Sequence, residues 1–158
     1  LFRSAIMRSE SAFVVDARSG AGALGLMQLM PATARETARR TGVKLAHMRQ
    51  LYQPDKNIAL GSAYLAQMLK RYDGNFAMAA AAYNAGPHRV RRWQQSDCTG
   101  ADIWIDTIPF KETRRYVRRA FFYTALYEAR LGQQMTKLNT VMPAIPASGT
   151  SNLADCNT

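Results

Sequence analysis

Apolar residues recur every three or four positions along much of the chain, which is the spacing of helices that bury one face. The clearest stripe is Ile58, Leu65, Met68, Leu69 and Tyr72, in a segment that begins at Pro54 and stops at Asp73-Gly74. No segment alternates convincingly between apolar and polar residues as a strand does. The pattern therefore predicts an all-α protein, with its longest early helix over residues 54–72.

Glycine and proline divide the rest of the chain into further helices. We expect them over residues 2–14, 24–29, 32–40, 76–85, 88–95 and 109–131, with Asn75 capping one of them. Residues 43–53 and 95–108 are typical of loops. From Gln133 the sequence becomes rich in Pro, Ser, Thr and Asn, which indicates an extended or disordered tail. The pattern predicts one domain over residues 1–132 and a tail over residues 133–158.

Composition narrows the classes of protein that fit. A chain of 158 residues is long enough for one domain with a real core, and no apolar run approaches the roughly 20 residues that span a bilayer. The formal net charge of +10 favours an anionic partner, such as nucleic acid, a membrane surface or an acidic polymer, or else a merely solvated basic surface.

The two cysteines, Cys98 and Cys156, form no CxxC motif and are not spaced with His47 or His88 as zinc ligands are. We therefore expect no metal site. In an oxidising compartment the two cysteines can pair, and in a reducing one they remain free thiols. The sequence leaves both states open.

An acid stands among apolar residues near the start, in the stretch SAIMRSESAF. At helical spacing Glu10 has Ile6, Met7, Phe13 and Val14 as neighbours, and no base lies at three or four residues from it. Burial among apolar groups raises the pKa of a carboxyl group, so that it can act as a general acid. The alternative is that Glu10 lies at the edge of the stripe and pairs with a distant arginine.

Five blocks together resemble the catalytic domain of the soluble lytic transglycosylases, in that family's order and approximate spacing. They are ESAF (10–13), ARSGAGALGLMQLMPATA (17–34), NIALGSAYL (57–65), AAYNAG (81–86) and IPFKETRRYV (108–117). The resemblance covers roughly residues 1–130 and implies a single all-helical, goose-type lysozyme-like domain with a catalytic cleft. One departure is His88, where the family more often has glycine after AYNAGP.

The resemblance implies roles residue by residue. It places Glu10 as the general acid and base, and it assigns substrate contacts to Ser19, Gln28, Met30, Tyr83, Asn84, Glu112 and Tyr116. Several of these have simpler roles open to them: Ser19 in a turn, Met30 and Tyr116 in a core, and Glu112 as an acid favoured at a helix N-terminus. Asp16 falls off the Glu10 face and is a poor candidate for a second carboxylate.

The implied substrate is peptidoglycan, cut between N-acetylmuramic acid and N-acetylglucosamine to leave a 1,6-anhydromuramyl end, without metal, cofactor or water. The implied location is the periplasm or cell envelope. The implied protein is a monomer whose longer chain has an N-terminal helical domain, with no membrane span. Whether it works from chain ends or within strands is left open.

Three other functions remain as alternatives. A hydrolytic, lysozyme-like muramidase would cut the same bond with water and would need a carboxylate to activate that water. A non-catalytic peptidoglycan-binding module would keep the cleft without the chemistry, although the retention of Glu10 argues against it. The basic stretches HRVRRWQQ and ETRRYVRR invite a nucleic-acid-binding reading, but that would leave the GLMQ and AYNAG blocks without a role. We expect no nucleic-acid partner.

Overall fold

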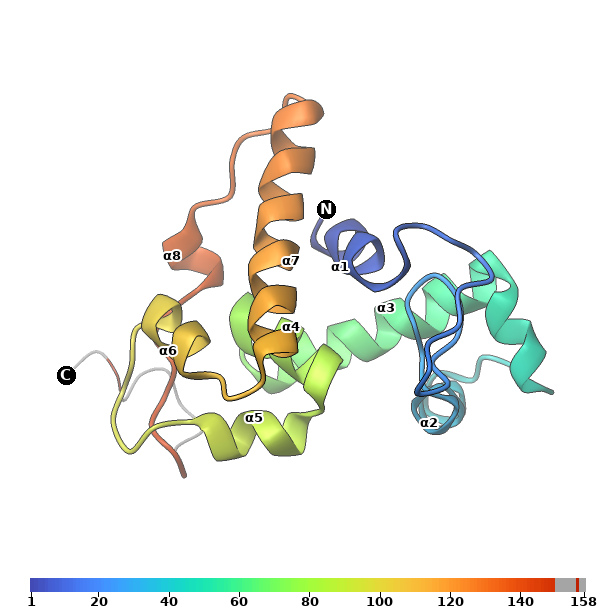
Figure 1. Cartoon of the computed structure of the whole chain (residues 1–158), viewed down its shortest axis with the longest axis horizontal. Coiled ribbons are helices and arrows are strands. Elements are labelled where there is room, and N and C mark those ends of the chain that lie inside the picture. Colours follow the sequence, from blue (N-terminus) through green and yellow to red (C-terminus); the bar gives the residue numbers. More distant parts are fainter. Residues whose placement is uncertain (150–155, 157–158) are drawn as a thin grey trace. The chain divides into compact units, whose positions relative to one another are not determined.

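A computed structural model describes residues 1–149 and 156 of the chain (Figure 1). Its helices are α1 (Phe2–Ser11), α2 (Pro31–Thr41), the 3-10 helix η1 (Met48–Tyr52), α3 (Pro54–Arg71), α4 (Phe76–Ala85), α5 (Pro87–Trp93), α6 (Ala101–Thr107), α7 (Lys111–Arg130) and α8 (Leu138–Val141). Extended pairing in the described part of the chain is confined to isolated bridges. The predicted all-α class is confirmed. Within the same residues, no helix combines the length and the apolar character needed to cross a membrane.

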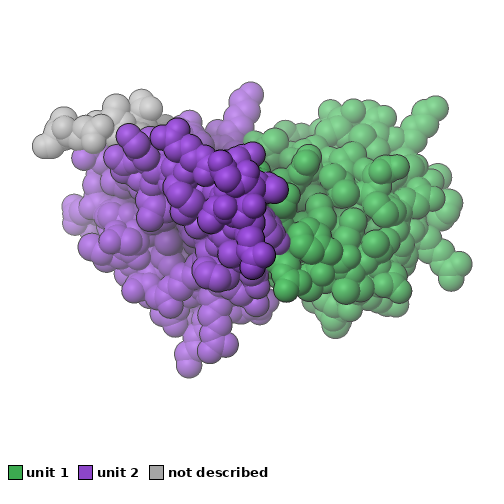
Figure 2. All heavy atoms as spheres, turned by 90° about the horizontal axis from the view of Figure 1, so that it is seen from above, with its two compact units in different colours: residues 1–67 green, residues 68–158 purple. Residues whose placement is uncertain are grey.

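The chain divides into two compact units, unit 1 (Leu1–Gln67) and unit 2 (Met68–Thr158), which Figure 2 shows in different colours. The division falls inside α3, so both units contain part of that helix. The boundary that the sequence predicts at residue 132 stays a prediction.

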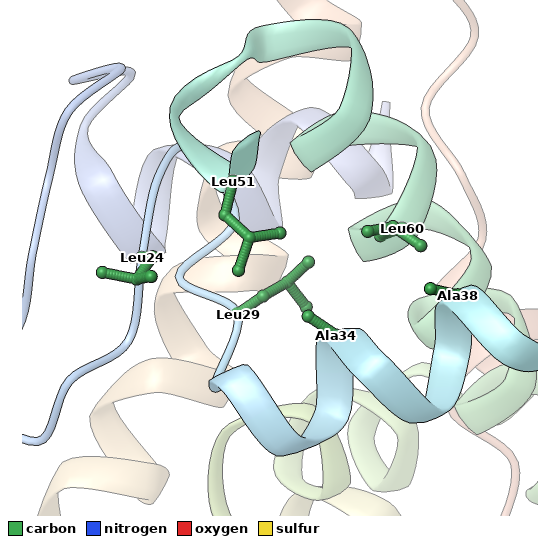
Figure 3. Close-up of a cluster of buried hydrophobic side chains, with 6 residues drawn as sticks. All are labelled: Leu24, Leu29, Ala34, Ala38, Leu51 and Leu60. Carbon is green, nitrogen blue, oxygen red and sulfur yellow. The ribbon is translucent and has the colours of Figure 1, made fainter. Parts of the chain in front are cut away.

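The core of unit 1 joins a loop to three helices. Figure 3 shows how the side chains of its buried cluster face one another, and the cluster consists of Leu24, Leu29, Ala34, Ala38, Leu51 and Leu60. Two come from the loop before α2, two from α2, one from η1 and one from α3. Burying an aliphatic side chain of this size contributes about 1.5–3 kcal/mol. The loop that carries several candidate site residues is therefore anchored by its own leucines.

Unit 2 is built around the alanine-rich helix α4, which lies beside α7 and α5 (Figure 1). Residues 77–83 of α4 are all buried, and their small side chains let neighbouring helices approach closely. The predicted cap is confirmed, because the Asn75 side chain accepts a hydrogen bond from the Met78 N–H at 3.0 Å. Helix α7 buries Thr113, Tyr116 and Val117, and then Ala120, one turn further along.

Three predicted elements are wrong in detail. Helix α1 ends at Ser11 rather than at residue 14, because Ala12 and Phe13 turn into left-handed conformations. Residues 24–29 do not form a helix, since Leu24 and Leu29 exchange backbone hydrogen bonds across a tight turn. The supposed loop 95–108 contains α6, which buries Trp104 and Ile105. The 3–4 residue spacing of the apolar residues in ADIWIDTI was the signal for that helix.

The described part of the C-terminal segment is extended, apart from α8, and is attached to unit 2. Thr99 and Ile145 exchange two backbone hydrogen bonds, and the Asn75 side chain donates to the Pro143 carbonyl at 3.0 Å. Cys98 and Cys156 form a disulfide, which settles the state of the two cysteines that the sequence left open. Residues 150–155 and 157–158 of the predicted tail lie outside the described residues.

Candidate active site

Glu10 lies in the last turn of α1, one residue before that helix ends, and its side chain is partly exposed. Half of its expected apolar setting is present, because Ile6 and Met7 are buried in the same helix. The other half is wrong, since Phe13 and Val14 lie beyond the helix and are 44% and 50% exposed. The early end of α1 thus leaves Glu10 in the last turn of the helix, directly before the loop that follows.

The backbone is strained shortly after Glu10, just beyond the end of α1. Ala12 and Phe13 have φ angles of 52° and 68°, a region that non-glycine residues rarely occupy. Such conformations cost of the order of 1–3 kcal/mol each and cluster at functional sites. The Ala12 N–H donates to the Arg8 carbonyl at 3.1 Å, which closes the helix and starts the loop. The left-handed conformations of Ala12 and Phe13 therefore end α1 just after Glu10.

Ser19 closes a tight turn within that loop. Its Oγ accepts a hydrogen bond from the Ala23 N–H at 3.0 Å, and its backbone N–H donates to the Ala23 carbonyl at 3.0 Å. The turn role considered from the sequence is therefore present. Because the oxygen accepts within the turn, the hydroxyl proton stays available to donate to a ligand.

Two backbone carbonyl groups fix which end of the Gln28 side-chain amide points toward the loop. Its Nε2 donates to the Ala17 carbonyl at 3.0 Å and to the Gly25 carbonyl at 2.8 Å, which uses both of its protons. Only the nitrogen end of an amide can satisfy two carbonyl oxygens, so Oε1 is the end left to accept hydrogen bonds from a ligand. Gln28 also has a φ angle of 46°, which is a further strained position after Ala12 and Phe13.

Asn57, at the start of α3, holds the loop in place, a role that the sequence did not assign to it. Its fully buried amide accepts from the Met27 N–H at 2.7 Å and donates to the carbonyls of Leu24 and Leu51 at 2.9 and 2.7 Å. The glycine beside it is required by space, because a Cβ on Gly25 would collide with the Leu51 carbonyl and the Asn57 amide. The sequence did contain a signal for this role, because Asn57 is a polar residue at the start of the otherwise largely apolar block NIALGSAYL.

Met30 ends the loop and precedes Pro31, the first residue of α2. Its side chain is 43% exposed, so it is not the core residue that was the simpler alternative. Glu10, Ser19, Gln28 and Met30 thus all belong to unit 1, and the last three stand on a single loop. Their contact with a substrate stays a prediction.

The other four predicted residues belong to unit 2. Tyr83 and Asn84 lie in the last turn of α4, with Tyr83 only 9% exposed. Glu112 is exposed in the first turn of α7, where the helix dipole favours an acid. Tyr116, one turn further, is 2% exposed and belongs to the core of unit 2. Its role as a substrate contact stays a prediction, as do those of the other three.

The predicted residues of each unit include groups that can donate or accept hydrogen bonds. One carboxyl group ends α1, an amide acceptor and a hydroxyl donor stand on the following loop, and a tyrosine and an asparagine end α4. In the described part of the chain, no group of three or more His, Cys, Asp or Glu residues is arranged to hold a metal ion. Groups of these kinds can transfer protons and form hydrogen bonds.

The chain matches one family of proteins over most of its length. The chain belongs to the transglycosylase SLT domain family, whose model matches residues 3–104. A second model, the soluble lytic transglycosylase helical domain, matches residues 107–135. The predicted family is confirmed.

Its relatives include soluble lytic murein transglycosylases. Those of Salmonella typhimurium and Escherichia coli K12 are 39% and 37% identical to this chain, over 84% and 87% of its length. The chain spans only about a fifth of these relatives, 21% and 22% of their lengths.

Solved structures of the same class agree. A structure of an inactive glutamate-to-glutamine mutant of the lytic transglycosylase Slt from Pseudomonas aeruginosa has a TM-score of 0.81 and 51% identity, covering 85% of this chain and 22% of that one. The 70-kDa soluble lytic transglycosylase from Escherichia coli has a TM-score of 0.79 and 35% identity, covering 87% of this chain and 23% of that one.

Proposed function

We propose that this chain is the catalytic part of a peptidoglycan lytic transglycosylase. It cleaves the β-1,4 bond between N-acetylmuramic acid and N-acetylglucosamine and leaves a 1,6-anhydromuramyl end. The observation that carries the proposal is the position of Glu10, a single carboxyl group at the end of α1 beside a strained loop, in a chain that the SLT family model matches. The relative crystallised as an inactive glutamate-to-glutamine mutant adds support, because one glutamate is essential in that protein.

The first step of the proposed reaction breaks the glycosidic bond. The protonated Glu10 carboxyl group donates its proton to the glycosidic oxygen, and the bond between that oxygen and C1 breaks. The carbonyl oxygen of the muramyl N-acetyl group forms a bond to C1 in its place, which gives an oxazolinium intermediate. Assistance by the substrate is one of the known exceptions to a pair of enzyme carboxylates.

The second step closes the anhydro ring. The Glu10 carboxylate takes the proton of the muramyl C6 hydroxyl, and that oxygen bonds to C1 as the oxazolinium ring opens. Glu10 is protonated again at the end, so the cycle consumes no water and needs no cofactor. Ser19, Gln28 and Tyr83 orient the sugar and its acetamido group, while Met30, Asn84, Glu112 and Tyr116 complete the substrate contacts.

The experiment is mass spectrometry of the soluble products from purified peptidoglycan, with Glu10→Gln as the control. Products with anhydro ends, absent from the control, are expected. Reducing-end products, heavier by one water, would establish a hydrolytic muramidase instead. Full activity of Glu10→Gln would remove Glu10 from the mechanism. Binding of glycan by both proteins without any cleavage would indicate a binding module.

The setting of the enzyme follows from the same family. We propose a periplasmic or cell-envelope location, because its relatives are named for murein and because the Cys98–Cys156 disulfide suits an oxidising compartment. A further helical domain in the same chain is proposed from the relatives' greater length. Glycan strands are the proposed partner, and the proposed state is a monomer.

A further inference from the structure

Inside unit 2, α4 and α7 are joined by a hydrogen bond between two polar side chains. Thr113, in the first turn of α7, donates from Oγ1 to the Oδ1 of Asn84, in the last turn of α4, at 2.7 Å. Thr113 is 2% exposed, while Asn84 is only partly buried. One end of the Asn84 amide is therefore tied to a buried partner, and the residue still reaches the surface.

The direction of this bond follows from the burial of Thr113. If the Asn84 amide were turned over, its Nδ2 would donate to the threonine oxygen, and the threonine proton would need another acceptor. Within the described residues, the hydrogen bond to Asn84 is the one that the Thr113 hydroxyl makes. A buried donor without a partner costs roughly 1–3 kcal/mol. The amide is therefore held with its oxygen toward Thr113 and its nitrogen away from it.

With its oxygen bonded to Thr113, the Asn84 amide presents its nitrogen, a hydrogen-bond donor, to a ligand. Its Nδ2 carries two protons, and no hydrogen-bond partner for that atom is found in the described part of the chain. The group that Asn84 recognises must therefore be an acceptor. Among the groups that both sugars of the glycan carry, the strongest such acceptor is the carbonyl oxygen of the acetamido group.

We propose that Thr113 is a positioning residue that locks the Asn84 amide, so that Nδ2 donates to the acetamido carbonyl of an N-acetylglucosamine unit. This inference rests on the proposed function. The acetamido group of the muramyl unit at the cleaved bond is the less suitable acceptor, because its carbonyl oxygen is the nucleophile in the first step. A hydrogen bond donated to that oxygen would lower its nucleophilicity toward C1, so we assign the acceptor to the acetamido group of the neighbouring N-acetylglucosamine unit.

The test compares Thr113→Val, which loses the hydroxyl, with Thr113→Ser, which keeps it. Two substrates are used, peptidoglycan and the same material with its N-acetylglucosamine units enzymatically deacetylated, which leaves the muramyl group intact. For Thr113→Val we expect a loss of about threefold to tenfold in kcat/KM on the acetylated substrate, equivalent to one neutral hydrogen bond. On the deacetylated substrate, wild type and Thr113→Val should be equally slow, and Thr113→Ser should match wild type on both.

The decisive quantity is the ratio of kcat/KM on the acetylated substrate to kcat/KM on the deacetylated substrate. Deacetylation adds positive charge to the glycan, but that effect is the same for every variant and cancels in the comparison. An equal loss by Thr113→Val on both substrates would show a merely structural role and overturn the proposal. Unchanged kcat/KM of Thr113→Val on both substrates would do the same.

A binding measurement separates this inference from the proposed function. Glu10→Gln, with and without Thr113→Val, is titrated with the tetrasaccharide of N-acetylglucosamine and with its glucosamine counterpart. We expect threefold to tenfold weaker binding of the acetylated probe when Thr113 is changed, together with loss of the probe-induced shift of the Asn84 side-chain NH2 signals in NMR spectra. Unchanged affinity and signals would overturn the role of Thr113, whether or not the wild type cleaves peptidoglycan.

Discussion

At the scale of single residues, buried polar side chains decide how loops meet helices in this protein. Asn57 satisfies three backbone groups in unit 1, and Thr113 fixes one end of Asn84 in unit 2. In each case a polar atom leaves water only because its partner is in place. The same logic applies to Glu128, a buried acid at the end of α7.

Glu128 gives a pH dependence whose sign can be worked out. It is 6% exposed and accepts hydrogen bonds from the Thr136 hydroxyl and, at 3.0 Å, from the Thr136 N–H. The side-chain bond, followed by the backbone bond, lowers the pKa of Glu128 below its ordinary 4.5, against the opposing effect of burial. A lowered pKa stabilises the fold above the unfolded-state value, and this stabilisation is lost as the pH falls through the folded-state value.

We therefore expect Glu128→Gln to lose less unfolding free energy than wild type when the pH is lowered from neutrality to well below 4.5. Urea denaturation of both proteins at several pH values measures this. If the unfolding free energies of the two proteins fell in parallel as the pH is lowered, Glu128 would not titrate as its contacts require.

The residues also show what sequence reasoning could and could not find. Glu10, Gln28 and Asn84 stood in recognisable blocks, so their positions in the chain were available before the fold. The hydrogen-bond partners that orient these side chains could not be predicted. The Gln28 amide, for example, is oriented by the carbonyl groups of Ala17 and Gly25, and the directions of those carbonyl groups depend on the folded loop backbone. Thr113 lies 29 residues from Asn84, and only the packing of α4 against α7 brings them together.

At the scale of elements, helices were predicted well where proline, glycine or a capping residue punctuates the chain. Pro54, Asn75 and Gly42 mark observed helix ends. The errors arose where tertiary contacts override local pattern. LGLMQL has helical composition, but Asn57 binds the backbone of Leu24 and Met27 and stabilises a turn instead.

The loop before α2 supplies a prediction with a matched control. Gly25 has a φ angle of 74°, and a Cβ there would collide with the Leu51 carbonyl and the Asn57 amide. Gly22 has a φ angle of 88° but nothing within 4 Å of such a Cβ. We expect Gly22→Ala to cost about 1–2 kcal/mol of unfolding free energy for its backbone alone, and Gly25→Ala to cost several kcal/mol in total and to abolish cleavage.

Chemical denaturation and the product assay on both variants test this difference. Equal costs for the two glycines would mean that the contact around Asn57 gives way easily, and that the loop is not held as tightly as its hydrogen bonds suggest.

At the scale of the whole molecule, the C-terminal segment of unit 2 is fixed by a covalent link. The Cys98–Cys156 disulfide joins residues 58 positions apart. By the loop-entropy model, closing a loop of that length stabilises a fold by roughly 4 kcal/mol. The double variant Cys98→Ser/Cys156→Ser should therefore unfold at a clearly lower temperature than wild type, and reducing agent should lower the wild-type temperature alone. A double variant as stable as wild type would mean that the noncovalent contacts of Ile145 and Pro143 suffice.

The charge of the whole chain gives a prediction about binding to cell walls. The net charge is +10, and in unit 2 a hollow of about 350 Å³ is lined by Asp106, Lys111, Arg114, Arg115 and Arg118. Peptidoglycan is anionic, so we expect weaker binding of intact sacculi as salt shortens the Debye length from about 10 Å at 0.1 M to about 3 Å at 1 M. Lys111→Gln should weaken pelleting with sacculi more than Arg130→Gln, which removes the same charge from the other end of α7. Equal effects would show that net charge matters and the hollow does not, and binding that is indifferent to salt would show that neither does.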